Sequence, residues 1–533
     1  MTNFNDASLA QIYAANPLKN TWVSANAGSG KTRVLTDRVA RLLLNNTNPQ
    51  KILCLTYTKA AAAEMQNRLF ESLGKWAMLP DEDLRDELIN LGEDNKILNT
   101  DKIKQARTLF AAALETPGGL KIQTIHSFCD ALLRQFPLEA GVSPQFIMLE
   151  ERQAKQLRIE VVERMAQQSD TSDIDMLAKH FTRLNTDDLT NEIVKKRSGF
   201  KIPPKHVDFG ISQDISIDDI FKETIIQHDD MIKSLIKVLN TGTKNDLKAA
   251  NNLKEYFSTD LINIKLKILE QVFLNGKTAK AGPYSAKDNI ATLKLIPKSN
   301  SLFNIQSVIS KDVEAARKHR LAINAYNRTL VLHNFANSFL KAYDKRKSFN
   351  AFLDYDDLIN LSSELLTSSS MAQWVLYKLD GGLDHILVDE AQDTSPTQWA
   401  VIDCLAREFT YGMSSNDRPR SLFIVGDEKQ SIYSFQGADP DIFSEKKSEF
   451  KSLLHHINQD MEDRELLYSF RSAPQILSLV DQTFANSDQK KLSPTHKAFH
   501  STKPGRVDLW PFIEKQDQPG KEVWYRPVDM PAP

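Results

Sequence analysis

The stretch ANAGSGKT, residues 25–32, decides the fold expected of the whole chain. It follows an apolar run at residues 21–24 and leads into residues 33–44, whose apolar side chains recur at helical spacing. A strand, a tight glycine turn and a helix are therefore predicted here. Such small residues let backbone N–H groups curl around phosphate oxygens, and the helix start adds a partial positive charge. A chance glycine turn before a surface helix is the alternative, but strand, loop and helix are the context that a phosphate-binding loop requires.

Two side chains of this stretch carry the expected chemistry. Lys31 would reach the β- and γ-phosphates of ATP, and Thr32 would ligate Mg²⁺. Upstream, the amide of Gln11 could donate to and accept from an adenine edge, although a glutamine in a polar segment is usually only solvated. The residues predicted to hold the nucleotide are Gln11, Ala25, Asn26, Ala27, Gly28, Ser29, Gly30, Lys31, Thr32 and Arg33.

Composition sets the class of protein. The 533 residues are 41% hydrophobic and 26% charged, as in an ordinary soluble globular protein of several domains. The net charge of −2 does not indicate a nucleic-acid binder, but a local basic groove remains possible. Cys54, Cys129 and Cys404 form neither a metal spacing nor a disulfide framework, so each is expected to be a small core residue in a reducing compartment. We find no signal peptide and no run long enough to cross a bilayer, and expect a cytoplasmic protein.

A pair of acids supplies what the phosphate loop lacks. Asp389 and Glu390 follow an apolar strand predicted at residues 385–388, and α/β sheets place their sites at the carboxyl ends of strands. Asp389 would hold Mg²⁺, and Glu390 would orient and deprotonate the attacking water. The alternative is an acidic turn without a function after a strand. A phosphate loop in the same chain disfavours this alternative, because the two acids supply the parts that the loop lacks.

Further candidates follow later segments. A strand predicted at residues 421–425 ends before Gln430, which could sense a γ-phosphate. Arg471 is a candidate cation for charge in the transition state, although a lone arginine is usually a surface ion pair.

Aromatic and histidine side chains at strand ends are candidates for nucleic-acid contact. Tyr57 follows a strand predicted at residues 52–56, and His126 follows one at residues 121–124. Tyr433 and Phe435 offer faces on which bases stack, a contact worth roughly 1–3 kcal/mol per base. Each aromatic could instead be core, and His126 could be a structural histidine.

The order of these segments resembles superfamily 1 helicases of the UvrD/RecB type, and within them the AddA branch of helicase–nucleases. Residues 25–32 resemble motif I and Gln11 the adenine-reading glutamine; residues 56–65 resemble motif Ia, 124–128 the single-strand-binding motif, 388–393 motif II, 425–433 motif III and 469–472 motif IV. The resemblance implies catalytic roles for Lys31, Glu390, Gln430 and Arg471. It implies DNA contacts for Thr56, Tyr57, Thr124, His126, Tyr433 and Phe435.

The resemblance also implies a fold and a domain organisation. We expect an α/β chain in which a RecA-like P-loop domain with a parallel sheet is interrupted by a helical insertion and followed by the start of a second RecA-like domain. Residues 1–149 and 346–458 would form the first motor domain, residues 150–345 the insertion, and residues 459–533 the second domain. Within that last part, the sequence pattern at residues 505–511 predicts a strand.

The implied function is ATP-driven movement in the 3′-to-5′ direction along single-stranded DNA, unwinding duplex ends in double-strand-break repair beside an AddB-like partner subunit. The sequence departs from the family pattern at Lys59, at Phe435 and Gln436, and at residues 469–470. Motifs V and VI and a nuclease domain are not found. We therefore expect the N-terminal part of a longer protein that binds nucleotide, hydrolyses it weakly and does not unwind DNA processively.

Three alternatives stay open at the level of sequence. The chain could be a non-motor DNA-binding subunit with a relict nucleotide site, a plain UvrD-type repair helicase, or a P-loop ATPase that acts on something other than nucleic acid. The acids at 389 and 390 disfavour a relict site, because such a site has no need of a residue that activates water.

Overall fold

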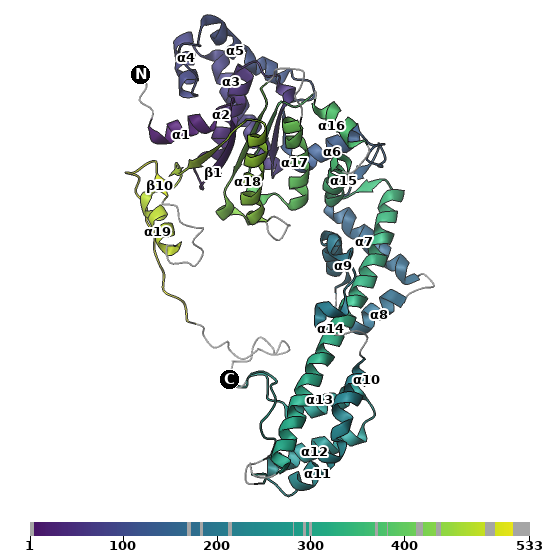
Figure 1. The fold of residues 1–533 in the computed structure, drawn as a ribbon. Coiled ribbons are helices and arrows are strands. Elements are labelled where there is room, and N and C mark those ends of the chain that lie inside the picture. Colours follow the sequence, from purple (N-terminus) through teal and green to yellow (C-terminus); the bar gives the residue numbers. More distant parts are fainter. Residues whose placement is uncertain are drawn as a thin grey trace, which may run out of the picture. The chain divides into compact units, whose positions relative to one another are not determined.

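Two compact units make up the chain in the computed structural model. The structure describes residues 5–167, 172–181, 185–211, 216–280, 282–291, 295–297, 301–367, 371–380, 382–411, 419–432, 439–484 and 496–514. Unit 1 comprises Met1–Phe146 and Tyr355–Pro533, and unit 2 comprises Ile147–Asp354 (Figure 1). The sequence predicted the limits of the inserted part at residues 150 and 345. Within the described ranges, every helix is too short or too polar to traverse a lipid bilayer.

Unit 1 is built on a parallel sheet of six strands in the order β3-β2-β6-β7-β1-β8. Its inner strands are buried along nearly their whole length, which is why they appear in the sequence as continuous apolar runs. The predicted α/β class with a parallel sheet is confirmed. The strands are β1 (Asn20–Ala25), β2 (Ile52–Thr56), β3 (Lys121–Thr124), β6 (His385–Val388), β7 (Ser421–Gly426) and β8 (Met461–Leu466).

Helices cover both faces of this sheet (Figure 1). On one face, residues of α2, α3 and α5 share a core with Leu387 and Phe423 of the strands. On the other face, Trp22 of β1 stacks on Trp399 of α17 at 6.4 Å and packs against Phe443 of α18 at 4.7 Å. The helices of unit 1 are α1 (Asp6–Ala14), α2 (Lys31–Leu44), α3 (Lys59–Met78), α4 (Asp81–Asn90), α5 (Thr100–Leu114), α6 (Ile125–Gln135), α15 (Tyr355–Thr367), α16 (Ala372–Asp380), α17 (Pro396–Tyr411), α18 (Pro440–His456) and α19 (Pro474–Phe484).

The cysteines fit this packing in part. Cys54 and Cys129 are buried and Cys404 is partly buried, and all three are free thiols.

The C-terminal segment of unit 1 corrects two predictions. β8 lies parallel to β1 from residue 461 to 466, so this strand belongs to the main sheet, although the sequence assigned everything from residue 459 to a second domain. No strand forms at residues 505–511, where Leu509 and Trp510 are exposed and no neighbouring strand among the described residues pairs with the backbone. Instead, β9 (Tyr468–Ser469) pairs with β10 (Lys497–Ala498) in a separate two-stranded sheet.

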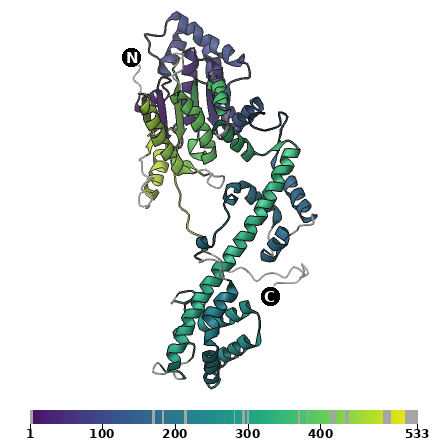
Figure 2. The same cartoon turned by 45° about the vertical axis from the view of Figure 1, so that its right-hand side comes forward.

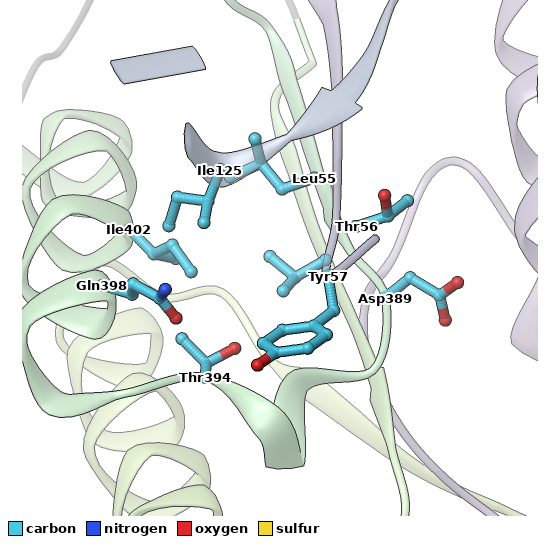
Figure 3. Close-up of a pocket in the computed structure, with 9 residues that line it drawn as sticks. Leu55, Thr56, Tyr57, Ile125, Asp389, Thr394, Gln398 and Ile402 are labelled. Carbon is cyan, nitrogen blue, oxygen red and sulfur yellow. The ribbon is translucent and has the colours of Figure 1, made fainter. Parts of the chain in front are cut away.

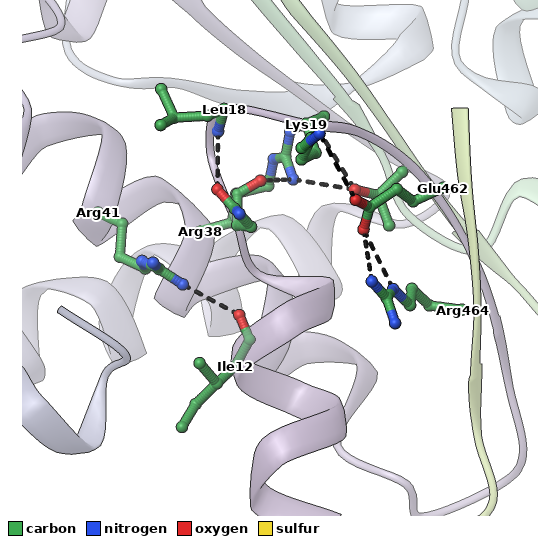
Figure 4. Close-up of polar contacts among 9 residues, drawn as sticks. Ile12, Leu18, Lys19, Arg38, Arg41, Glu462 and Arg464 are labelled. Carbon is green, nitrogen blue, oxygen red and sulfur yellow. Dashed lines mark hydrogen bonds and ion pairs between the residues drawn. The ribbon is translucent and has the colours of Figure 1, made fainter. Parts of the chain in front are cut away.

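A buried arginine links α2 by hydrogen bonds to the end of the sheet where the strands begin. Arg38 is fully buried, and its guanidinium donates hydrogen bonds to the carbonyl oxygens of Asn16 and Lys19 and to Ser421 Oγ. Nearby, Glu462 of β8 pairs with Lys19 at 3.9 Å and with Arg464 at 2.7 Å (Figure 4). These contacts tie the approach to β1 to the strands on either side of it.

Unit 2 is almost entirely helical and is organised along one helix of 49 residues, α14 (Ser301–Phe349) (Figure 2). The first half of α14 contributes Ile309 and Val313 to one apolar core, and its second half contributes Phe335 and Phe339 to another. The other elements are β4 (Ile147–Met148), α7 (Glu151–Gln167), α8 (Ser172–His180), α9 (Thr186–Lys195), α10 (Ile217–Ile220), α11 (Asp229–Leu239), α12 (Lys244–Ser258), α13 (Ile262–Phe273) and β5 (Phe352–Leu353).

Candidate active site

The loop between β1 and α2 has the geometry of an anion site. Gly28 and Gly30 have φ angles of +73° and +89°, which side-chain-bearing residues rarely adopt. Gly30 is the N-cap of α2 and has no side chain to cap it, so the first N–H groups of the helix are left for an anion. Ser29 Oγ is buried in this loop and lacks a hydrogen-bond partner among the described residues. A triphosphate would supply acceptors for these groups.

Gln11 makes a hydrogen bond to the loop between β1 and α2. Its buried Nε2 donates a hydrogen bond to the carbonyl oxygen of Ser29 at 2.9 Å. A Cβ atom added to Gly30 would lie 2.6 Å from this nitrogen, so the loop and the amide are closely packed. The contact with adenine that the sequence predicted for Gln11 stays a prediction.

Lys31 and Glu390 meet across 359 residues of sequence. Lys31 Nζ donates to Glu390 Oε2 at 2.9 Å, and the lysine side chain is only 11% exposed. Lys31 begins α2 after β1, and Glu390 follows β6, so both side chains lie at the carboxyl ends of parallel strands. The structure therefore gathers the predicted phosphate-binding lysine and the predicted base in one place.

Asp389 is the buried member of the acidic pair. Its burial, together with the charge of Glu390, raises the pKa of Asp389 to about 7. The backbone N–H of Glu390 donates to Asp389 Oδ1 at 3.0 Å, and Glu390 has a left-handed φ of +48°. A buried carboxylate with a raised pKa is ionised most readily beside a cation, and its oxygens are ligands that Mg²⁺ prefers. With Thr32 in the first turn of α2, the donor set fits Mg²⁺ bound to a triphosphate.

The two remaining catalytic candidates lie beside this centre. Gln430, in a short turn after β7, donates to Asp427, whose backbone N–H donates to Gln392 Oε1 at 2.9 Å. The segment that carries Arg471 lies on the phosphate loop: Phe470 N–H donates to the carbonyl oxygen of Gly28 at 2.8 Å.

That segment also explains why residue 28 is a glycine. A Cβ on Gly28 would lie 2.8 Å from the Cβ of Arg471.

The candidate DNA residues follow neighbouring strands. Thr56 of β2 pairs in register with Thr124 of β3, and Thr124 Oγ1 caps α6 by accepting from Ser127 N–H at 3.2 Å. His126 lies edge-on to Tyr355 with ring centroids 5.5 Å apart, and burial lowers the pKa of His126, which favours a neutral ring. Tyr433 and Phe435 lie outside the described residues.

Tyr57 lines a pocket at the carboxyl ends of β2 and β6 (Figure 3). Its ring lies towards Thr394, whereas the carboxylate of Asp389 points away from the ring. Tyr57 and Asp389 thus border one pocket from different strands. The residues that line it are Leu55, Thr56, Tyr57, Ile125, Val388, Asp389, Thr394, Gln398 and Ile402.

Sequence reasoning missed three residues in this region. Gln392 and Asp427 connect Glu390 to Gln430, and Tyr355 packs on His126. The only sequence signal was their position within or beside segments already singled out, because the contacts arise from tertiary structure.

Comparison with known proteins agrees with this geometry. Residues 6–451 match the model of the UvrD/REP helicase N-terminal domain, and the chain belongs to that family. It is similar to the AddA chain of the ATP-dependent helicase/nuclease of Clostridium botulinum, with 25% identity over 511 residues, or 87% of this chain and 38% of the relative. The protein of the same name from Clostridium beijerinckii is 26% identical over 529 residues, or 91% and 39%. That from Listeria welshimeri is 25% identical over 507 residues, or 87% and 38%.

The match is broad for this chain and partial for its relatives. The chain spans less than two-fifths of the length of these curated relatives.

Proposed function

We propose that this chain is the ATP-hydrolysing motor portion of a DNA-repair helicase that moves 3′ to 5′ along single-stranded DNA. The observation that carries the proposal is the contact between Lys31 and Glu390, which unites the phosphate loop with the acidic strand end. The similar proteins are named as one chain of an ATP-dependent helicase/nuclease, which supports a motor that works within a larger assembly. Duplex DNA ends as the point of entry and an AddB-like partner subunit are further parts of the proposal.

In this proposal, the residues of the site divide the tasks of binding and hydrolysis. The phosphate-loop N–H groups and Lys31 would hold the triphosphate, while Asp389 and Thr32 would hold Mg²⁺, which when bound would neutralise phosphate charge. Glu390 accepts a proton from the attacking water. Gln430 and Arg471 contact the γ-phosphate, and Arg471 stabilises charge that develops in the transition state.

DNA contact would couple to this site through the adjacent strand ends. Thr56 ends β2 and Tyr57 follows it, and β2 lies beside β6 and therefore beside Asp389. Thr124 ends β3, on the other side of β2, and His126 follows it. A strand of DNA lying over these ends would be within one or two strands of the site of hydrolysis, where the sheet can transmit small movements.

The test is hydrolysis of ATP with and without oligo(dT). We expect oligo(dT) to stimulate turnover in the parent protein and Lys31→Ala to reduce that turnover by about 100-fold or more, because the lysine both binds and stabilises the phosphates. Lys96→Ala, a change at an exposed lysine, is the control. Undiminished turnover in Lys31→Ala would exclude the role of this residue, and turnover without any DNA stimulation would favour an ATPase with another target.

Polarity needs a separate measurement. Oligo(dT) of increasing length with a fluorophore at the 5′ or the 3′ end reports arrival of the motor at that end. We expect the length-dependent signal at the 5′ end from the longer protein that the sequence analysis expects, and not from residues 1–533 alone. A signal that depends on length only at the 3′ end would contradict the proposed direction.

A further inference from the structure

The amide of Gln392 spans the space between two strand ends. Gln392 is 1% exposed, and its Nε2 donates to Glu390 Oε2 at 2.8 Å and to Asp393 Oδ2 at 3.2 Å. Its Oε1 accepts from the backbone N–H of Asp427 at 2.9 Å. One side chain thus holds the predicted base after β6 with one end and the turn after β7 with the other.

The end of β7 is closely packed against this amide and against Phe443. A Cβ added to Gly426 would lie 2.8 Å from Gln392 Oε1 and 2.7 Å from the Phe443 ring, so a glycine allows both side chains to approach. The side chain of Asp427 then accepts hydrogen bonds from Lys429 N–H at 3.2 Å and from the amide of Gln430. Hydrogen bonds therefore run without a break from Glu390 through Gln392 and Asp427 to Gln430.

Two features make Glu390 depend on this support. Its φ of +48° is uncommon for a residue with a side chain, and such a conformation persists only where surrounding contacts hold it. Its Oε2 accepts from both Lys31 and Gln392. Since a bound triphosphate would compete for Lys31, Gln392 is the donor that remains, among the residues the structure describes, to hold the carboxylate.

We propose that Gln392 is a positioning residue for ATP hydrolysis, which orients Glu390 and links it to the turn that carries Gln430. The inference rests on the proposed function and adds a residue to which no role was assigned. In the alternative, Gln392 only satisfies buried polar groups, and its loss affects folding without a specific effect on turnover.

Two substitutions separate the ends of the link. Gln392→Glu in its ionised form keeps an oxygen that accepts from Asp427 but cannot donate to Glu390, whereas Gln392→Met is of similar size and breaks both ends. Gln306 of unit 2 supplies the matched control: it is fully buried, its Nε2 donates to Asn289, and its Oε1 accepts from Ile290 N–H at 3.3 Å. Gln306→Glu and Gln306→Met therefore remove the same kind of buried amide elsewhere in the chain.

The experiment measures binding and turnover separately in the parent and the four variants. The dissociation constant of a β,γ-methylene ATP analogue reports binding, and single-turnover hydrolysis with oligo(dT) reports the chemical step. For both Gln392 variants we expect a dissociation constant within about threefold of the parent and a hydrolysis rate lowered by about tenfold or more, because orientation of a general base acts mainly on the chemical step. For both Gln306 variants we expect changes below about twofold in either quantity.

Each outcome of this experiment either supports or overturns the positioning role of Gln392. Retained binding with slowed hydrolysis in the Gln392 variants alone supports the positioning role, and retained binding also shows that the variants are folded. Equal hydrolysis rates in Gln392→Glu and Gln306→Glu would overturn it while leaving the proposed function intact. Weakened binding that accounts for the whole loss of turnover would overturn it as well. A parent protein that does not hydrolyse ATP would remove the proposed function and this inference together.

Discussion

Stability of unit 1 should fall as the pH drops, because a histidine is buried in its sheet. His385 on β6 is buried, and its Nδ1 lies 2.8 Å from Ser421 Oγ, the same oxygen that accepts from Arg38. Burial and then the charge of Arg38 lower the pKa of His385 from its ordinary 6.5 to about 4, and Lys51 adds to this effect against the opposing charge of Asp384. The folded protein therefore keeps this ring neutral where the unfolded chain protonates it.

The difference in pKa between the folded and unfolded states sets the sign and the size of the change in stability with pH. Between pH 6.5 and about 4 the unfolded chain binds the proton and the folded protein does not, so falling pH favours unfolding. At pH 8 both states hold a neutral ring and the full stability is present. A pKa difference of about two and a half units, at about 1.36 kcal/mol for each unit, corresponds to a loss of about 3 kcal/mol by pH 4.

The assay compares the parent with His385→Asn, which keeps a polar atom near Ser421 but does not titrate. Urea unfolding is followed by the fluorescence of the buried pair Trp22 and Trp399 from pH 8 to pH 4. Acidic side chains titrate in both proteins and cancel in the difference. We expect the free energy of unfolding of the parent, relative to the variant, to decrease by about 3 kcal/mol over this range. A difference that does not change with pH would refute the reasoning.

Two further predictions concern α2 and the loop before it. Gly30→Ala places a methyl 2.6 Å from Gln11 Nε2 at a φ of +89°, so we expect affinity for the ATP analogue to fall about tenfold. Adding Gln11→Ala should restore only part of this affinity, because the strained φ remains. An unchanged dissociation constant in Gly30→Ala would contradict this. Arg38→Met leaves buried carbonyl and hydroxyl groups without their donor, so we expect the free energy of unfolding of unit 1 to decrease by about 3 kcal/mol. Urea unfolding measures it, and a loss below about 1 kcal/mol would argue against a structural role for this arginine.

The buried strands were predictable because their chemistry is local. The apolar runs at residues 52–56 and 385–388 coincide with β2 and β6, and the strand predicted at residues 121–124 coincides with β3. The N-cap of α3 is equally local, since the side chain of Thr58 accepts a hydrogen bond from Ala61 N–H. Both signals depend on residues within one turn or one strand, and the sequence displays them directly.

The edge of the sheet and the link within the site were not predictable in this way. β8 is an edge strand with the sequence MEDREL, whose four consecutive charged residues are exposed or partly buried, so no apolar run marks it. The opposite error occurred at residues 505–511, where apolar residues suggested a strand that has no partner strand among the described residues. Proximity of Lys31 to Glu390 followed from their strand ends, but the amide bridge of Gln392 depends on how β6 and β7 are placed side by side.

The strand order has a consequence for the order in which the protein assembles. β1 and β2 emerge first from the ribosome, yet they are not neighbours: β6 and β7 lie between them in the finished sheet. More than 300 residues therefore separate the synthesis of β1 from that of the strand that joins it to the others. Until then the amino-terminal strands have unpaired edges, which invite aggregation, and the nascent chain must be shielded during that interval. In unit 2, helices α11, α12 and α13 pack on their neighbours in sequence, so this part of the chain can fold during the wait.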